Sequence, residues 1–349
     1  MTKLFKFGLA TVLLIGGWLL FSNYQKDFST NPITNRTGES ENEGGMGEPT
    51  PHPLSIEALR DGDYPGSDLV VEQTLTPGSN YKRYVASYKS EGLKIYGLLT
   101  VPDPDNQKYP AIIFNHGYIA PNVYKTTEKY VAYQDAFARA GYVTFKSDYR
   151  GHGNSEGSAT GGYGSNNYTI DVLNALASVK RHPAVDPEKI GMWGHSMGGS
   201  ITLKSMVVRK DVKAGVIWAG VVGSYPDLIE RWRRRQGPTP TINPTNPRGR
   251  WRAELIEKYG EPKDNPAFWN SISANSFLGD ISGPLELHHG TADTSVPLEF
   301  SKTLESQMNS AGKEVSLFIY EGDDHNLSKN LSTALNRSVE FFDKYVKGE

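Results

Sequence analysis

Short apolar runs alternate with segments of helical periodicity along most of this chain, and this alternation limits the folds that it can adopt. The runs are YPAIIFNHG, YVTFKSDY, KIGMWG, AGVIWAG, PLELHHG and VSLFIYEG. Apolar runs of this length suit strands that are buried on both faces of a sheet. The helical patterns fall at 127–140, 166–182, 198–209, 298–311 and 328–346. The sequence therefore predicts an α/β fold, with a mostly parallel sheet and helices on both of its faces.

Two further strands precede this alternation. Residues 82–102, KRYVASYKSEGLKIYGLLTVP, combine β-formers with a turn at Ser90, Glu91 and Gly92. Such a pattern is typical of a hairpin. With these two strands, we expect a sheet of about eight strands.

The first 53 residues differ in composition from the rest. Two lysines precede an apolar run that, as a helix, spans roughly 22 Å, short of the ~30 Å hydrocarbon core of a bilayer. We expect residues 1–24 to be a membrane anchor, with a cleaved secretory signal or a buried core helix as alternatives. Either of the first two places the remainder outside the cytoplasm. Residues 25–53 are poor in apolar side chains and predict a flexible linker before a domain at 54–349.

Composition excludes several function classes. The 349 residues carry a formal net charge of −2, so no overall field favours nucleic acid as a partner. The chain has no cysteine, which excludes disulfides, thiolate metal sites and a cysteine nucleophile. We expect neither a metal nor an organic cofactor, and the sequence does not determine the oligomeric state.

A serine between two glycines is the strongest chemical signal. The stretch GMWGHSMGGS, residues 191–200, places Ser196 between Gly194 and Gly198, and Ser155 lies in a second G-x-S-x-G. A nucleophile elbow stands directly between a strand and a helix, which fits Ser196. Ser155 follows its strand by several residues and precedes a stretch too rich in glycine to be helical. We predict that Ser196 is a nucleophile and that Ser155 is a loop residue beside the site.

A nucleophilic serine needs a base within hydrogen-bond reach and a carboxylate that orients the base. In this topology both follow the serine, in the order acid then histidine, on loops after later strands. Asp293 and His325 follow the last two predicted strands and have this order, so we predict them as acid and base. His195 adjoins the serine and is expected to point elsewhere. Asp323 and Asp324 are interpreted as solvated turn formers.

The oxyanion of an acyl-transfer intermediate needs preorganised donors. One is expected to be the backbone N–H of Met197, the residue after the serine. The other is expected from the loop after AIIFNHG, at Tyr118, through its amide or its hydroxyl group.

From about residue 80 to 346 the chain resembles the α/β-hydrolase superfamily, and within it the catalytic domain of the prolyl oligopeptidase group of serine peptidases. The matching stretches are YPAIIFNHG, DYRGHGNSEG, VDPEKIGMWGHSMGG and HHGTADTSVPLEFSKTLESQMNSAGKEVSLFIYEGDDH. The resemblance implies an α/β-hydrolase fold with Ser196 as nucleophile, Asp293 as acid and His325 as base. Two features depart from that group: too little ordered chain precedes residue 80 for a β-propeller, and GHSMGG is at least as common among esterases and lipases.

One segment breaks the alternation of strands and helices. Residues 223–280 are far longer than a usual crossover and predict a small, partly helical lid over the carboxyl edge of the sheet. The lid carries Arg233, Arg234 and Arg235. Guanidinium groups bind carboxylates and phosphates in a bidentate way, so these arginines are candidates to hold an anionic substrate group or to contact an anionic membrane. The alternative is a solvated helix face balanced by nearby acidic residues.

These features together predict a serine hydrolase that cleaves an acyl bond through an acyl-enzyme. A peptidase of the prolyl oligopeptidase type is the first expectation, and a carboxylesterase or lipase-like ester hydrolase is the alternative. The second alternative is a non-catalytic binding protein on a hydrolase scaffold. The expected partners are a peptide or small ester substrate and, through the N-terminal segment, a membrane.

Overall fold

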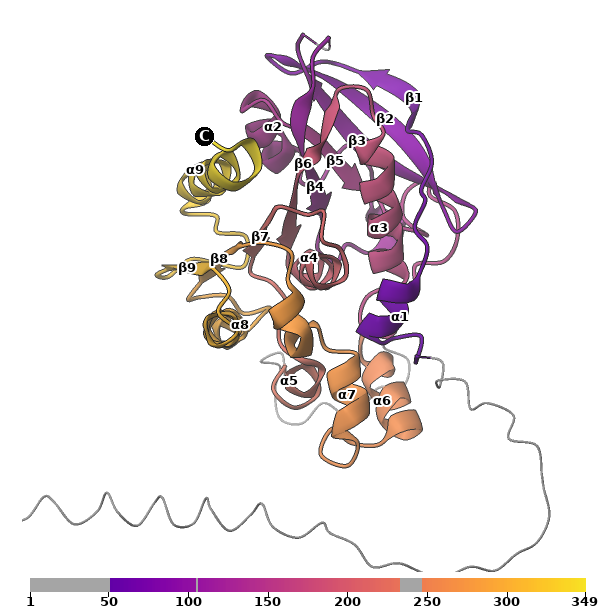
Figure 1. The fold of residues 1–349 in the computed structure, drawn as a ribbon, viewed down its shortest axis with the longest axis vertical. Coiled ribbons are helices and arrows are strands. Elements are labelled where there is room, and N and C mark those ends of the chain that lie inside the picture. Colours follow the sequence, from indigo (N-terminus) through magenta and orange to yellow (C-terminus); the bar gives the residue numbers. More distant parts are fainter. Residues whose placement is uncertain (1–50, 105, 233–246) are drawn as a thin grey trace, which may run out of the picture. The chain divides into compact units, whose positions relative to one another are not determined.

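The computed structural model describes residues 51–104, 106–232 and 247–349, and these residues form a nine-stranded sheet flanked by helices (Figure 1). The strands are β1 (Val70–Leu75), β2 (Tyr81–Ser90), β3 (Leu93–Pro102), β4 (Tyr109–Asn115), β5 (Val143–Ser147), β6 (Val185–His195), β7 (Ala214–Trp218), β8 (Leu285–Gly290) and β9 (Val315–Tyr320). Their order across the sheet is β1-β2-β3-β5-β4-β6-β7-β8-β9. From β5 to β9 every neighbouring pair is parallel, so the carboxyl ends of these strands meet at one edge.

All strands predicted from the sequence are present, and the prediction of a mostly parallel sheet is confirmed. The prediction of about eight strands missed β1, which pairs antiparallel with β2. Most side chains of β1 are exposed, including Val70 and Val71, which are 55% and 51% exposed. A strand that buries neither face lacks the apolar pattern by which the others are recognised.

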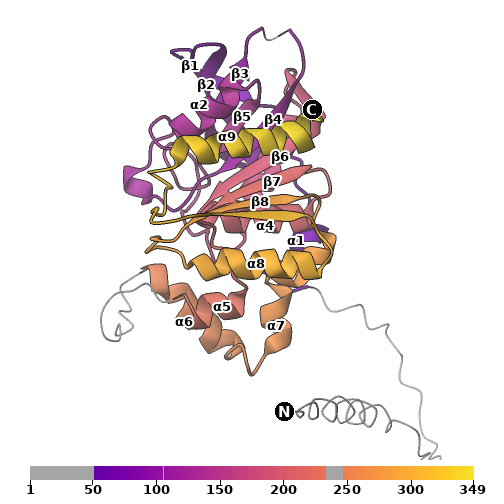
Figure 2. The same ribbon diagram turned by 90° about the vertical axis from the view of Figure 1, so that its left-hand side faces the viewer.

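Helices cover both faces of the sheet, as expected (Figure 2). On one face lie α3 (Asn167–Lys180), α4 (Met197–Val208) and α8 (Leu298–Ser310), with the short α1 (Ile56–Asp61) beside them. On the other face lie α2 (Val131–Arg139) and α9 (Leu331–Phe342), and the chain ends in the π-helical turn η3 (Asp343–Lys347). A single turn, η1 (Pro121–Val123), interrupts the loop after β4.

Each face has its own apolar core. The smaller one joins Trp193 and Trp218 of the sheet to Phe137 of α2 and Phe342 of α9, all of them fully buried. Burying one such side chain contributes roughly 1.5–3 kcal/mol, so these contacts hold α2 and α9 on the sheet. The larger core lies between the sheet and α3, α4 and α8.

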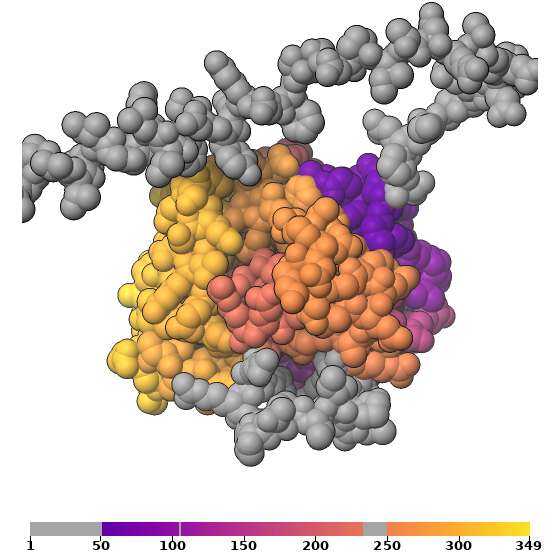
Figure 3. Space-filling view, turned by 90° about the horizontal axis from the view of Figure 1, so that it is seen from below, coloured from indigo at the N-terminus to yellow at the C-terminus, as the bar shows by residue number. Residues whose placement is uncertain are grey.

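The segment at 223–280 contains helices in its described part. They are α5 (Tyr225–Glu230), α6 (Pro247–Tyr259), α7 (Pro266–Ser271) and the 3-10 turn η2 (Ala274–Asp280). A separate apolar cluster holds α5, α6 and α7 together, formed by Tyr225, Leu255, Trp269 and Ile272. Seen from below, the orange surface of this insertion occupies the middle of the face, with the indigo start of the described chain beside it (Figure 3).

The described chain begins on this insertion. Nε2 of His52 lies 2.6 Å from the hydroxyl group of Tyr259, and its ring packs edge-on against Tyr259 and Phe268. Ordered contacts therefore start slightly before residue 54, where the sequence placed the domain boundary.

Several predictions concern residues outside the described part. The expected anchor at 1–24, nearly all of the expected linker at 25–53, and Arg233, Arg234 and Arg235 belong there, so they remain predictions. Across residues 51–349, apart from the gaps named above, no helix combines the length and the apolar composition needed to cross a bilayer.

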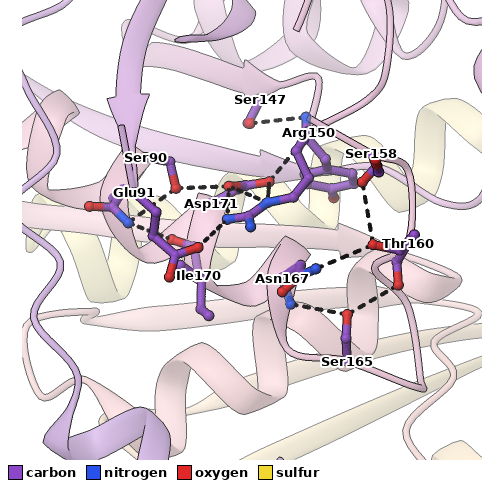
Figure 4. Close-up of polar contacts among 12 residues, drawn as sticks. Ser90, Glu91, Ser147, Arg150, Ser158, Thr160, Ser165, Asn167, Ile170 and Asp171 are labelled. Carbon is purple, nitrogen blue, oxygen red and sulfur yellow. Dashed lines mark hydrogen bonds and ion pairs between the residues drawn. The ribbon is translucent and has the colours of Figure 1, made fainter. Parts of the chain in front are cut away.

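A buried ion pair anchors the long loop between β5 and α3 (Figure 4). The guanidinium group of Arg150 donates through Nε at 3.1 Å and through NH2 at 2.7 Å to the carboxylate of Asp171, which is fully buried on α3. Asp171 also accepts a hydrogen bond from Ser90 at 2.8 Å, and Arg150 reaches Glu91 at 2.7 Å. The loop, α3 and the β2–β3 turn are thus tied together.

Candidate active site

Ser196 occupies a strained turn between β6 and α4. Its backbone has φ 55° and ψ −118°, a region that non-glycine residues rarely adopt. A Cβ on Gly198 would lie 1.8 Å from the carbonyl oxygen of Asn115, and one on Gly194 would lie 2.4 Å from the carbonyl oxygen of Gly198. Only glycine allows the backbone to pass this closely, which explains the G-x-S-x-G spacing, and Ser196 has the backbone geometry expected of a nucleophile elbow.

The second serine motif has a different structure. Ser155 lies in the β5–α3 loop, outside any helix or strand, and its hydroxyl oxygen accepts a hydrogen bond from the N–H of Tyr96 at 2.9 Å. Gly153 and Gly157 adopt positive φ angles of 56° and 85°. The motif therefore shapes a loop and fastens it to β3, as the interpretation of Ser155 as a loop residue expected.

The structure brings Asp293 and His325 together from two separate loops. Asp293 follows β8, His325 follows β9, and Nδ1 of the histidine lies 2.7 Å from Oδ2 of the aspartate. The other carboxylate oxygen accepts hydrogen bonds from the N–H groups of Ser295 at 2.7 Å and Val296 at 3.0 Å. With its carboxylate held on both sides, Asp293 fixes one edge of the imidazole and leaves Nε2 of His325 directed away from it.

The carboxylate of Asp293 is held in its ionised form. Burial alone would raise its pKa, but hydrogen bonds from His289, His325 and the Val296 N–H outweigh burial and lower the pKa below its usual range. Nε2 of His289 lies 3.2 Å from Oδ2, and Nδ1 of His289 lies 2.8 Å from the hydroxyl group of Ser301. His289 is therefore a second partner of the acid that sequence reasoning did not identify.

This pKa shift predicts how stability depends on pH. Because the folded-state pKa of Asp293 lies below the unfolded value of about 3.9, the carboxylate stabilises the fold above roughly pH 5, and the contribution is lost as the pH falls. The difference in unfolding free energy between the wild type and Asp293→Asn is expected to be largest near pH 7 and to shrink towards pH 3. Urea denaturation at several pH values measures it. A constant difference over this range would contradict the prediction.

Ser196 and His325 line one pocket of about 310 Å³. The other lining residues are Gly117, Tyr118, Ile119, Lys129, Tyr130, Tyr133, His195 and Asn326. Tyr118 is 48% exposed and lies on the loop after β4, where the sequence placed an oxyanion donor. Met197 begins α4, and the first N–H groups of a helix have no acceptor within the helix. The predicted nucleophile, base and oxyanion donors thus surround or adjoin one cavity.

The loop that carries His325 is built by its two preceding aspartates. Asp324 accepts hydrogen bonds from the N–H groups of Asn326 and Ser328, as a turn former does. The interpretation of Asp323 as solvated is wrong, because its side chain is fully buried. Its carboxylate accepts hydrogen bonds from the backbone N–H groups of residues 324, 329 and 330, which offset the cost of burial.

The expectation that His195 points away from the site is also wrong. Its buried ring lines the pocket and lies 4.6 Å from the ring of His325, centroid to centroid. The hydroxyl group of Tyr130, a residue that sequence reasoning did not single out, lies 2.7 Å from Nδ1 of His195. His195 is the last residue of β6. At the end of a strand the alternation of side chains no longer indicates to which side a residue points, so the sequence did not reveal this direction.

Two family models match the chain. The one described as serine aminopeptidase, S33, matches residues 107–250, which include Ser196. The model of the prolyl oligopeptidase family matches residues 240–349, which include Asp293 and His325. Both models are named for peptidases, and together they cover the strands from β4 onward.

Two curated proteins of Bacillus subtilis strain 168 are similar to this chain, and both are described as uncharacterized peptidases. YtmA is 25% identical over 72% of this chain and 88% of its own length. YuxL is also 25% identical, over 68% of this chain but 34% of its own length. The alignment with YtmA is therefore nearly full-length, and that with YuxL spans one part of a longer protein.

Solved structures share the fold. Acylaminoacyl peptidase of Pyrococcus horikoshii superimposes with a TM-score of 0.60 and 24% identity, over 77% of this chain and 42% of that one. Est1E of Butyrivibrio proteoclasticus, with ferulic acid bound, gives a TM-score of 0.57 and 21% identity, over 75% of this chain and 99% of that one. The chain thus spans about two-fifths of the peptidase and nearly all of Est1E. The sheet and these matches show that the chain has the α/β-hydrolase fold and is a serine hydrolase, and that its C-terminal part is similar to the prolyl oligopeptidase family.

Proposed function

We propose that this protein hydrolyses acyl bonds through a catalytic triad of Ser196, His325 and Asp293, by way of an acyl-enzyme. The observation that carries the proposal is the 2.7 Å hydrogen bond between His325 and Asp293, formed on the wall of the pocket that Ser196 also lines. Ser196 and His325 line one pocket, and Asp293 contacts His325 from a neighbouring loop at the same edge of the sheet. An arrangement of this kind is recognised by its geometry and its roles.

In the first half of the reaction, the hydroxyl oxygen of Ser196 attacks the substrate carbonyl carbon. Its proton passes to Nε2 of His325, because Nδ1 of that ring already donates its proton to Asp293 at 2.7 Å. The imidazolium that forms is stabilised by the ionised carboxylate. The same proton then passes to the leaving amine or alcohol as the tetrahedral intermediate collapses to the acyl-enzyme.

In the second half, His325 takes a proton from water, and the resulting hydroxide attacks the acyl carbon. Collapse of this intermediate breaks the ester bond to Ser196 and returns the proton to its oxygen. The backbone N–H groups of Met197 and Tyr118 are the proposed donors to the oxyanion in both halves. Donors that are already in place cost no reorganisation during the reaction, and each contributes on the order of 10²- to 10³-fold to kcat.

The proposed substrate is a peptide bond. Both family models are named for peptidases, and so is the relative YtmA, which matches over 88% of its length. The pocket of about 310 Å³ has the volume needed to hold a side chain.

An ester substrate is the second candidate. The observation in its favour is that the fold covers 99% of Est1E but 42% of the acylaminoacyl peptidase. The part of that peptidase outside the match has no counterpart in the described residues. A pocket of about 310 Å³ suits small esters at least as well as peptides.

Covalent labelling tests the proposed chemistry. A fluorophosphonate probe is expected to label the wild type at one serine, and peptide mapping is expected to find the adduct on Ser196. Ser196→Ala is expected to remain unlabelled, with Ser155→Ala as the matched control that is still labelled. An unlabelled wild type, or labelling of Ser196→Ala at the wild-type rate, would favour a non-catalytic scaffold.

A paired substrate panel separates the two candidates. p-Nitrophenyl acyl esters and aminoacyl or prolyl anilides would be compared on the full chain by kcat/KM. Turnover of anilides that Ser196→Ala abolishes supports the peptidase. Turnover of esters alone makes the protein an ester hydrolase.

A further inference from the structure

His195 joins the loop of the proposed base to the loop of the proposed oxyanion donor. Nε2 of its ring lies 2.9 Å from the backbone carbonyl oxygen of His325, and Nδ1 lies 2.7 Å from the hydroxyl group of Tyr130. The N–H of Gly117 donates to that same hydroxyl group at 2.9 Å. Gly117 directly precedes Tyr118 in the chain, so three hydrogen bonds connect the two sides of the pocket.

The directions of these hydrogen bonds can be assigned. A carbonyl oxygen only accepts, so Nε2 of His195 carries the proton that is donated to His325. Burial, reinforced by the neighbouring His325, lowers the pKa of His195 to about 3, so the ring is neutral and Nδ1 is an acceptor. Burial also raises the pKa of Tyr130, which therefore keeps its proton and donates it to Nδ1.

Both side chains lie in closely packed surroundings. His195 is 4% exposed and stacks on Trp193, while the backbone of Tyr130 adopts the left-handed region with φ 62°. A Cβ on Gly117 would lie 2.8 Å from the Tyr130 hydroxyl group and 3.1 Å from Cβ of Ser196. The oxyanion loop therefore comes close to the nucleophile at a point where only glycine fits.

We propose that Tyr130 and His195 are positioning residues that hold the oxyanion loop and the His325 loop at the spacing the reaction requires. This inference rests on the proposed function, because it assigns the two residues a role in that same site. Neither residue exchanges protons with substrate. β4 and β9, after which the two loops come, are separated in the sheet by β6, β7 and β8, so no direct strand pairing sets the spacing. The hydrogen-bonded pair supplies that link, through the residue next to the nucleophile.

Tyr130→Phe tests the proposal because it removes one hydroxyl group. The N–H of Gly117 then loses its hydrogen-bond acceptor, and Nδ1 of His195 loses its donor. A displacement near 1 Å of a catalytic group costs on the order of 100-fold, so kcat for a p-nitrophenyl ester is expected to fall about 10- to 100-fold. KM is expected to stay within about threefold, because the change acts on groups used in the transition state. The rate of fluorophosphonate labelling is expected to fall in parallel.

Tyr142→Phe is the matched control. It also removes a buried phenol hydroxyl group that donates one hydrogen bond, at 2.7 Å to Asp343, but Tyr142 does not line the pocket. Both variants are expected to lose similar thermal stability, and Tyr130→Phe alone is expected to lose kcat. Equal kcat for the two variants, or a fall in kcat only in proportion to unfolded protein, overturns the proposal.

Replacing His195 gives a second, independent readout. A glutamine offers one acceptor and one donor, so His195→Gln is expected to retain at least tenfold more kcat than His195→Leu. In the wild type, NMR of the His195 ring nitrogens is expected to show the neutral form with the proton on Nε2 between pH 5 and 8. Titration of this ring near pH 6.5 overturns the assignment. If the fluorophosphonate does not label the wild type, both the proposed function and the positioning role are refuted. If it labels the wild type but Tyr130→Phe has the wild-type kcat, only the positioning role is refuted.

Discussion

Ser196→Ala is expected to lower kcat/KM for any turned-over ester or anilide by at least about 10⁴-fold, while KM and the folded structure change little. The alanine lacks the oxygen that becomes acylated, so the remaining rate comes from the pocket and the oxyanion donors alone. Because Ser196 already sits at φ 55°, alanine adopts the same strained turn without a new clash. The loss is therefore one of chemistry and is measured by steady-state kinetics beside a thermal unfolding scan.

The proposed triad also predicts the effect of combining variants. His325→Ala and Asp293→Asn are each expected to lower kcat by more than about 10³-fold, since groups that act as a unit fail together. Added to Ser196→Ala, either change is expected to cost less than a further tenfold. Ser155→Ala is the control, because its hydroxyl group only fastens a loop to β3. Losses that multiply across the three positions would show that these residues act independently, and the triad assignment would be withdrawn.

The sequence predicted the sheet well because most strands are buried on both faces. The continuous apolar runs that such burial demands are found in β4, β5, β7 and β8. The helices between these strands have apolar residues at helical spacing. Ser196 was identifiable for a related reason. Gly194 and Gly198 lie so close to neighbouring backbone that only glycine fits there. This requirement is visible in the sequence as the two glycines of the G-x-S-x-G motif.

Three other polar residues beside the site could not be recognised from the sequence. His289, His195 and Tyr130 act through side-chain directions that are set by tertiary packing, and a histidine in any of several loops fits the same pattern. Asp323 was misjudged because an acidic residue in a turn is usually solvated, whereas here three backbone N–H groups converge on it. Local sequence reports the period of burial, but it does not report which buried polar groups find one another.

The other large effect concerns stability. Asp171→Ala is expected to lower the free energy of unfolding by about 3–5 kcal/mol, because it leaves the guanidinium group of Arg150 buried with only the half-exposed Glu91 as a partner. Burial raises the pKa of Asp171 in spite of its hydrogen bonds to Arg150, so removing water from this pair is costly. The pair therefore contributes little net stability, yet breaking it on one side is expensive.

Asp68→Ala is the matched control, since Asp68 also pairs with an arginine, Arg181, at 3.2 Å but is 88% exposed. It is expected to change the free energy of unfolding by less than about 1 kcal/mol. Calorimetry of both variants measures the contrast, and Asp171→Ala is expected to lower Tm by roughly 5–15 °C. Arg150→Met combined with Asp171→Ala is expected to recover part of that loss, because the double variant leaves no buried charge. Equal Tm values for Asp171→Ala and Asp68→Ala would mean that water or Glu91 compensates Arg150, and that the β5–α3 loop is held by its other contacts.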